Sequence, residues 1–224
     1  MRQRPVAAAF DIIETVFSLE RLRERLTAAG LPGGSLETWF AQTLRDAFAL
    51  EVTGVYKPFR EIASATLASL FAGHGTPPEP ARLPQVLDGF AELAPHPDAG
   101  SAFRRLHEAG IRIVSLTNGG AAVTEKLLQS AGLRQLVERT ITVDEVAHWK
   151  PHADVYLHAA KCVGADPARL ALVAAHPWDI HGAGRAGLTT AYVARGKPFP
   201  ATMMPPHVTG ASLAEVADAL ASLS

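Results

Sequence analysis

The sequence predicts an α/β fold in which helices cover both faces of a parallel sheet and a block of helices interrupts the core after the first strand. Residues 6–10 form an apolar run that is too short for a helix and precedes Asp11, which favours a buried parallel strand. Residues 18–93 show helical periodicity and no convincing strand. From Pro95 onward strands and helices alternate, as they do when parallel strands are joined by crossover helices.

The helical block is recognised from apolar residues that recur at helical spacing. We expect its helices at residues 19–29, 36–50, 58–72 and 82–93. Gly30 ends the first helix, and a proline-rich stretch at residues 75–80 separates the third from the fourth. The predicted division is therefore a discontinuous core of residues 1–17 and 94–224 and an all-helical cap of residues 18–93.

The second part of the core alternates regularly between the two kinds of element. We expect strands at residues 111–116, 139–143, 170–174 and 189–193. We expect helices at residues 98–109, 120–131, 152–163, 180–186 and 212–223. Strands separated by helices of this length predict a Rossmann-like parallel sheet with helices on both faces.

The bulk composition is that of a globular protein that contacts neither nucleic acid nor membrane. Of 224 residues 48% are hydrophobic, and 21 basic residues against 22 acidic ones give a net charge of −1. The basic residues are scattered, so no electrostatic footprint for nucleic acid or for an anionic membrane is expected. The single cysteine, Cys162, fits a reducing compartment. There is no run of 18 apolar residues and no signal-peptide pattern, so we predict a cytoplasmic location.

Polar side chains follow four of the expected strands, where the carboxyl ends of parallel strands open into a crevice. They are Asp11, Thr15, Thr117, Asn118, Lys150, His176 and Asp179. Each one alone also fits a helix cap, a turn or a solvated surface position. Their joint placement favours a single site.

The motifs that contain these residues resemble, in order, those of the haloacid dehalogenase (HAD) superfamily. The motifs are Asp11-x-x-x-Thr15-x-Phe17, Ser115-Leu116-Thr117-Asn118-Gly119, Lys150-Pro151 and Trp178-Asp179. Lys150-Pro151-x-x-x-Val155-Tyr156 is also similar to the type II L-2-haloacid dehalogenases. The helical block sits where that superfamily inserts a cap.

The resemblance implies a hydrolase that displaces halide from a small 2-halo acid through an aspartyl ester, without a cofactor. Asp11 would be the nucleophile, and Lys150 and Thr15 would support it. A lysine within about 4–6 Å lowers the pKa of a carboxyl group, which keeps the nucleophile ionised. Asp179 would orient Lys150, order the hydrolytic water or ligate a metal.

The expected partner is a small anionic molecule. The Thr117 hydroxyl and the backbone N–H groups of Asn118 and Gly119 would form a cradle for a carboxylate or a phosphate. The further residues expected to bind substrate are Ile13, Phe40, Tyr156, His176 and Trp178. A homodimer is expected by analogy with relatives.

Two positions depart from the pattern of HAD phosphatases. These enzymes carry a general acid two residues after the nucleophile, because an alkoxide leaving group needs a proton, and here that residue is Ile13. Position 175, where a phosphatase places another Mg²⁺-binding aspartate, is Ala175. If Mg²⁺ bound at all, Asp11 and Asp179 would hold it. Halide leaves without protonation, so the absence of carboxyl groups at positions 13 and 175 tells against a phosphatase and is compatible with dehalogenation.

Other positions depart from the dehalogenase pattern. Glu14 brings a second acid beside Asp11, which would raise the pKa of Asp11 or repel an anionic substrate unless Glu14 turns away. The cap arginine of the dehalogenases falls at Phe40, with Arg45 or Arg60 as substitutes. Two alternatives therefore stay open: a Mg²⁺-dependent phosphatase with an unusual acid such as Glu14, or a catalytically weakened binding protein.

Three histidines lie close to the motifs. His176 stands where the dehalogenases have a polar Ser-Ser-Asn segment, and it fits a replacement base, a water-positioning group or a packed loop residue. His148 and His152 flank Lys150-Pro151, but nothing near them in the sequence supports a metal site.

Overall fold

The computed structural model describes residues 3–75 and 81–224, so the proline-rich separator lies almost entirely outside the described residues. Its core is a six-stranded sheet in the order β5-β4-β1-β6-β7-β8, and every pair of neighbours is parallel. The strands are β1 (Ala7–Phe10), β4 (Arg112–Thr117), β5 (Arg139–Thr142), β6 (Leu170–Ala174), β7 (Thr189–Val193) and β8 (Val208–Gly210). The predicted parallel α/β sheet is confirmed.

The first strand occupies the middle of this sheet. Phe10 pairs with Ser115 of β4 on one side and with Val173 of β6 on the other. All four residues of β1 are buried, and successive side chains point to opposite faces. Asp11 therefore emerges between the carboxyl ends of two neighbouring strands.

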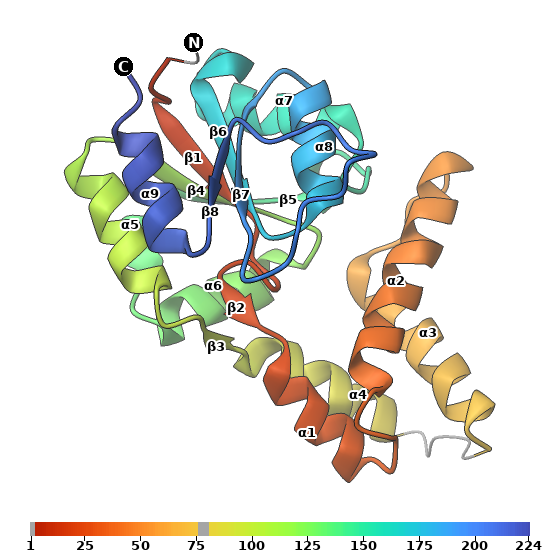
Figure 1. The fold of residues 1–224 in the computed structure, drawn as a ribbon. Coiled ribbons are helices and arrows are strands. Elements are labelled where there is room, and N and C mark those ends of the chain that lie inside the picture. The colour runs from red at the N-terminus through yellow and green to blue at the C-terminus, as the bar shows by residue number, and fades with distance from the viewer. Residues whose placement is uncertain (1–2, 76–80) are drawn as a thin grey trace.

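Helices cover both faces of the sheet, as predicted (Figure 1). On one face α5 (Ala99–Glu108) and α9 (Leu213–Ala221) pack against each other, and the Phe103 ring of α5 lies 4.5 Å from the ring of Phe10. On the other face lie α7 (Ala153–Cys162) and α8 (Pro177–Arg185). α6 (Ala121–Ser130) follows β4, and each face has its own apolar core.

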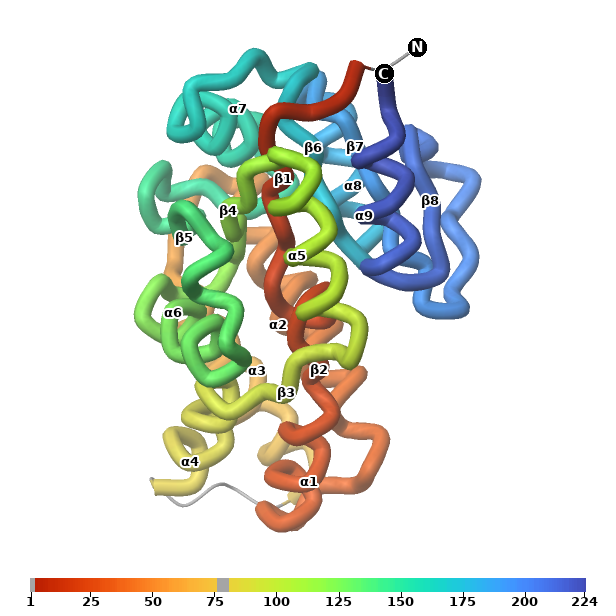
Figure 2. Tube along the Cα trace, turned by 90° about the vertical axis from the view of Figure 1, so that its left-hand side faces the viewer, coloured from red at the N-terminus to blue at the C-terminus, as the bar shows by residue number. Residues whose placement is uncertain are grey.

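Four helices separate β1 from the rest of the core. They are α1 (Glu20–Ala28), α2 (Ser35–Val52), α3 (Phe59–Gly73) and α4 (Arg82–Asp88), which a short 3₁₀ turn, η1 (Gly89–Glu92), continues. Two short strands, β2 (Phe17–Ser18) and β3 (Ala94–Pro95), pair in antiparallel fashion at the two ends of this segment. Figure 2 shows α1 and α4 at the end of the molecule opposite the C-terminus.

The structure differs from the sequence prediction at element ends and in the shortest strands. β2, β3 and β8 contain two or three residues each, too few to show a period in the sequence. The helix predicted at residues 180–186 begins earlier, at Pro177, because proline at the first helical position has a helical φ and needs no N–H partner. No helix in the described part of the chain is long and apolar enough to cross a bilayer.

Candidate active site

One buried lysine lies between two buried carboxylates at the carboxyl end of the sheet. The Lys150 ammonium donates to Asp11 Oδ1 at 3.0 Å and to Asp179 Oδ2 at 2.9 Å. Asp11 follows β1, Lys150 lies in the segment after β5, and Asp179 lies in the first turn of α8. Lys150 and Asp179 have no exposed surface, and Asp11 is 5% exposed. The three groups therefore form a buried ion-paired unit, and Asp11 is its only member with exposed surface.

The second oxygen of Asp11 is held from two further directions. The Thr15 hydroxyl donates to Asp11 Oδ2 at 2.6 Å and accepts from the Ala175 N–H at 2.9 Å. Nδ1 of His176 lies 3.1 Å from the same Asp11 oxygen. Because a carboxylate only accepts, the hydrogen of a neutral His176 is placed on Nδ1, which leaves Nε2 as an acceptor. Asp11 is thus fixed in one orientation.

These contacts shift the pKa values of the two carboxyl groups in opposite directions. Burial alone would raise the pKa of Asp11, but the Lys150 charge and the hydrogen bonds from His176 and Thr15 hold that pKa well below its usual range. Burial opposes the charge of Lys150 too, yet the two carboxylates raise its pKa. Burial, assisted by the charge of Asp11, raises the pKa of Asp179. Asp11 is therefore a carboxylate at neutral and mildly acidic pH.

Tyr156, which we expected to bind substrate, lies behind Asp179 instead. Its side chain is fully buried, and its hydroxyl donates to Asp179 Oδ1 at 2.7 Å. Burial and the charge of Asp179 raise the pKa of Tyr156 well above its usual range, so the hydroxyl keeps its proton. This placement corrects the sequence expectation, because Tyr156 supports Asp179 and does not face a cavity.

Replacing Tyr156 by phenylalanine removes the donor and leaves Asp179 Oδ1 buried without it. We expect Tyr156→Phe to lower the free energy of unfolding by about 1–3 kcal/mol. Tyr192→Phe is the matched control, because the Tyr192 hydroxyl donates at 3.2 Å to the backbone oxygen of Lys197 and not to a carboxylate. Urea denaturation of both variants measures the difference, and equal losses would contradict this account of Tyr156.

Two polar groups of the loop after β4 form hydrogen bonds within the protein. The Gly119 N–H donates to the Thr117 hydroxyl at 2.9 Å, and the Asn118 side chain accepts from the Lys150 N–H at 3.1 Å. In this structure the Gly119 N–H therefore donates within the loop. The Thr117 hydroxyl and the Asn118 N–H are left as candidate donors, while the Asn118 side chain positions the backbone of Lys150.

Glu14 turns away from Asp11. Its backbone has a φ of 65°, in the left-handed region, and its carboxylate accepts from the Leu19 N–H at 2.7 Å, at the start of α1. The condition that removes the rise expected from Glu14 is therefore met, and the pKa of Asp11 is lowered.

Two cavities lie beside the buried unit. One of 440 Å³ is lined by Glu14, Phe40, His176 and Lys197 among others. A smaller one of 150 Å³ is lined by Ile13 and Gly119, with residues of α3 and α6 around it. Both cavities lie between the inserted helices and the carboxyl end of the sheet. Ile13 thus lines the smaller cavity, whereas Phe40 and His176 line the larger one.

Aromatic rings from the inserted helices contact the loop after β6. Phe40 lies 6.1 Å from the ring of His176, which stacks on Trp178 at 5.1 Å. Phe48 packs edge-on against Trp178 at 5.4 Å. Aromatic side chains of α2 therefore pack against both His176 and Trp178.

Of the two arginines expected as substitutes for the cap arginine, Arg60 reaches one of these cavities and Arg45 lines neither. Arg45 is bonded to Asp46 on the surface, and Arg60, which lines the smaller cavity, is bonded to Asp88. Lys197, in the loop between β7 and β8, lines the larger cavity. The sequence carries no motif at Lys197, so only the fold brings it to the site.

The family model described as haloacid dehalogenase-like hydrolase matches residues 7–187. The chain belongs to this family. It is therefore a hydrolase, and its fold is the fold of that family.

Individual relatives agree with the family assignment. The (S)-2-haloacid dehalogenase of Xanthobacter autotrophicus is 27% identical over 192 residues, covering 84% of this chain and 75% of the relative. The structure of the L-2-haloacid dehalogenase from that organism with chloropropionic acid covalently bound superposes with a TM-score of 0.90 at 21% identity, covering 98% of this chain and 100% of that one. A glyceraldehyde 3-phosphate phosphatase of Methanopyrus kandleri is 26% identical over 200 residues, 85% of this chain and 84% of the phosphatase.

One of these relatives is a phosphatase, which raises the question whether the residues around Asp11 suit Mg²⁺. Both oxygens of Asp179 are engaged, by Lys150 and Tyr156, and the Lys150 ammonium already lies between Asp179 and Asp11. Position 175 is alanine and offers no side-chain oxygen. Mg²⁺ requires several oxygen ligands in octahedral geometry, and this arrangement does not supply them.

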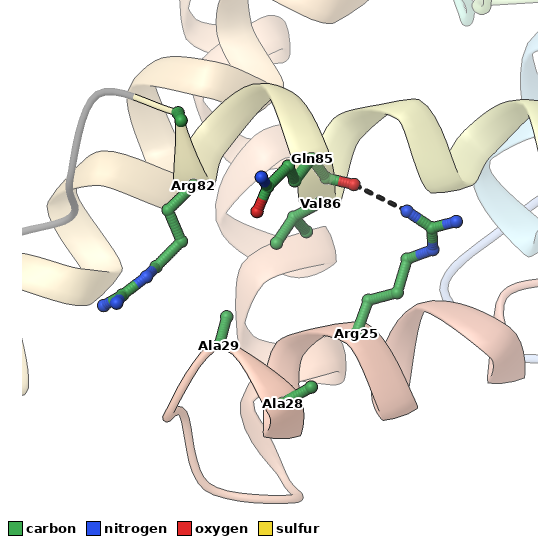
Figure 3. A pocket seen from close by; sticks show the side chains of 7 residues that line it. Arg25, Ala28, Ala29, Arg82, Gln85 and Val86 are labelled. Atoms are coloured by element: carbon green, nitrogen blue, oxygen red, sulfur yellow. Dashed lines mark hydrogen bonds between the residues drawn. The ribbon is translucent and has the colours of Figure 1, made fainter.

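Another pocket lies away from Asp11. It measures 380 Å³ and lies between α1 and α4, and Figure 3 shows the Arg25 side chain donating across it to the Gln85 backbone oxygen. None of the residues around Asp11 lines it. We assign it no role in the reaction.

Proposed function

We propose that this hydrolase is a 2-haloacid dehalogenase that works without a metal through an ester of Asp11. The observation that carries the proposal is the buried Asp11 carboxylate, held ionised by Lys150 beside Ile13, a residue that cannot protonate a leaving group. Halide needs no proton to leave, whereas an alkoxide does. The (S)-2-haloacid dehalogenase relative supports the same chemistry.

The reaction proceeds in two displacements. An oxygen of Asp11 attacks the halogen-bearing carbon, a C–O bond forms, and the halide leaves with the electron pair of the broken carbon–halogen bond. Water then attacks the ester carbonyl, and Nε2 of His176 takes one proton of that water. The hydroxy acid leaves after its alkoxide oxygen takes the second proton of that water, Asp11 is restored as a carboxylate, and His176 returns the first proton to solvent.

The proposed roles of the remaining residues follow from where these residues lie in the structure. Residues 18–93 act as the cap, and Ile13, Phe40 and Trp178 exclude water from the reacting carbon. The Thr117 hydroxyl and the Asn118 N–H bind the substrate carboxylate, and the Lys197 ammonium, which lines the larger cavity, attracts the anionic substrate. Asp179 holds Lys150 in place. The cytoplasmic location and the homodimer expected from the sequence stay predictions.

A substrate screen tests the proposal against its alternatives. Purified protein is incubated with a panel of small 2-halo acids and a panel of phosphate esters, each with EDTA and with added Mg²⁺, and halide and phosphate are both measured. We expect halide release that is equal under the two conditions and no release of phosphate. Mg²⁺-dependent phosphate release would assign a phosphatase, and no turnover on either panel would assign a binding protein.

His176 separates the two chemical steps. We expect His176→Asn, which keeps a hydrogen-bonding side chain but no base, to slow ester hydrolysis by about 10²–10⁴-fold while the first displacement continues. A rapid burst of about one halide per chain should then be followed by slow turnover. His74→Asn, at the end of α3, is the control and should turn over normally. A slowed burst without accumulation of the ester would contradict this role for His176.

A further inference from the structure

A second cluster of polar side chains lies where α2 meets the segment that carries Lys150. The Glu51 carboxylate, near the end of α2, accepts hydrogen bonds from Nδ1 of His148 at 2.7 Å and from the Trp149 N–H at 2.7 Å. The Glu51 side chain is only 13% exposed, and the Trp149 N–H fixes its orientation. This contact joins two segments that are far apart in the sequence.

His152 completes the cluster. The rings of His148 and His152 stack 3.9 Å apart at an interplanar angle of 7°. One ligand atom from each of Glu51, His148 and His152 can be chosen so that all three lie within 4.8 Å of one another. Asp154 Oδ2 lies 3.9 Å from a ring nitrogen of each histidine. Two imidazoles and the Glu51 carboxylate therefore lie together at the surface, and Asp154 lies next to both rings.

We infer that Glu51, His148 and His152, with Asp154 or water as a fourth ligand, form a binding site for a transition-metal ion of the zinc class. Imidazole with carboxylate is a donor set that zinc accepts, whereas Mg²⁺ and Ca²⁺ require oxygen ligands throughout. The Trp149 N–H supplies the outer hydrogen bond that such carboxylate ligands commonly have. Neither Asp11 nor Lys150 takes part in this site, so it is independent of the proposed dehalogenase chemistry.

Metal binding requires a small local rearrangement. Zinc lies about 2.0–2.2 Å from its ligands, so two ligands of one ion are roughly 3.5 Å apart. The stacked rings must tilt so that one nitrogen of each points at the ion, and the proton between His148 and Glu51 must leave. Both histidine side chains are 37% exposed, so they can move and the ion can reach them. The bound ion ties α2 to the segment that precedes Lys150.

A second candidate cluster of similar composition provides the comparison. Glu145, His158 and Cys162 also place three ligand atoms within 4.8 Å. There, however, the Arg139 guanidinium lies 2.7 Å from the Glu145 oxygen that contacts His158. A bound cation would have to displace this positive charge, so the structure favours the cluster around Glu51.

Zinc titration tests the inference on the full chain without a polyhistidine tag. Isothermal titration calorimetry with Zn²⁺ should give about one ion per chain for the wild type and for His158→Ala. We expect the double variant His148→Ala/His152→Ala to bind at least about 100-fold more weakly, because losing ligands costs more than losing their outer hydrogen bonds. Added Zn²⁺ should raise the Tm of the first two proteins and leave that of the double variant unchanged.

Glu51→Gln provides a milder test that keeps an acceptor for the Trp149 N–H. We expect zinc affinity to fall at least about tenfold in this variant, with circular dichroism spectra like those of the wild type. The inference is overturned if the wild type binds no Zn²⁺, or if neither the double variant nor Glu51→Gln binds it more weakly. It is also overturned if His158→Ala abolishes binding, since the ion then lies at the other cluster.

Discussion

Asp11→Asn should lower the rate of halide release by at least about 10⁴-fold, because an amide oxygen is a poor nucleophile and no second group can form the ester. The substitution preserves the size of the side chain, and Thr15 can still donate to the amide oxygen. The fold should therefore remain intact. An ion-selective electrode measures the halide, and mass spectrometry of the quenched wild type should reveal an adduct on the peptide that contains Asp11.

The matched control for this change is Asp46→Asn. Asp46 lies on α2 and is bonded to Arg45 at the surface, so the variant should release halide at the wild-type rate. An Asp11→Asn protein that retained more than about a tenth of the wild-type rate would rule out Asp11 as the nucleophile. An adduct on another residue would do the same.

Lys150→Met should both abolish activity and destabilise the protein. The change leaves Asp11 and Asp179 buried side by side without the cation that both contact. Breaking a buried ion pair by removing one partner costs about 3–5 kcal/mol. Chemical denaturation at pH 7 measures the loss. Lys57→Met is the control, because the Lys57–Glu61 pair is about half exposed and should contribute less than about 1 kcal/mol.

The effect of Lys150→Met should depend on pH. In the wild type the pKa of Asp11 is lowered, so the stability that its charge contributes is present above the ordinary carboxyl pKa of about 4 and is lost as the pH falls. Without Lys150, burial raises the pKa of both carboxyl groups, which then take up protons as the solution is acidified. The difference in stability between variant and wild type should therefore shrink from pH 7 toward pH 4. A constant difference would show that lost packing, and not charge, is its cause.

The parts of the fold that follow from local pattern were predictable from the sequence. The buried strand before Asp11 and the alternation after Pro95 are set by hydrophobicity and periodicity, and the structure confirms the parallel sheet that they predict. The order of the strands also brings Thr15, Lys150 and Asp179 to one edge. Their roles in catalysis stay a proposal.

The features that sequence reasoning missed depend on directions that side chains take in three dimensions. Glu14 is harmless to Asp11 because one backbone φ sends its carboxylate to the Leu19 N–H. Tyr156 reaches Asp179 from behind, and Lys197 arrives from a loop without a motif. His148 found no metal-ligand support in the sequence because Glu51 comes from a helix about a hundred residues earlier. A local sequence pattern does not specify the direction of a side chain or its contacts with residues far away in the sequence.

The central position of β1 also sets how much of the chain must be synthesised before Asp11 has its contacts. β1 is made first, but its partners β4 and β6 follow only after the inserted helices and much of the core. Such long-range pairing is slow, and an unpaired apolar strand invites association with other chains. A nascent chain that has not passed residue 174 lacks one neighbour of β1, and the N–H of Ala175 that positions Thr15 does not yet exist. Asp11 therefore acquires the contacts that orient and ionise it only after most of the chain has been translated.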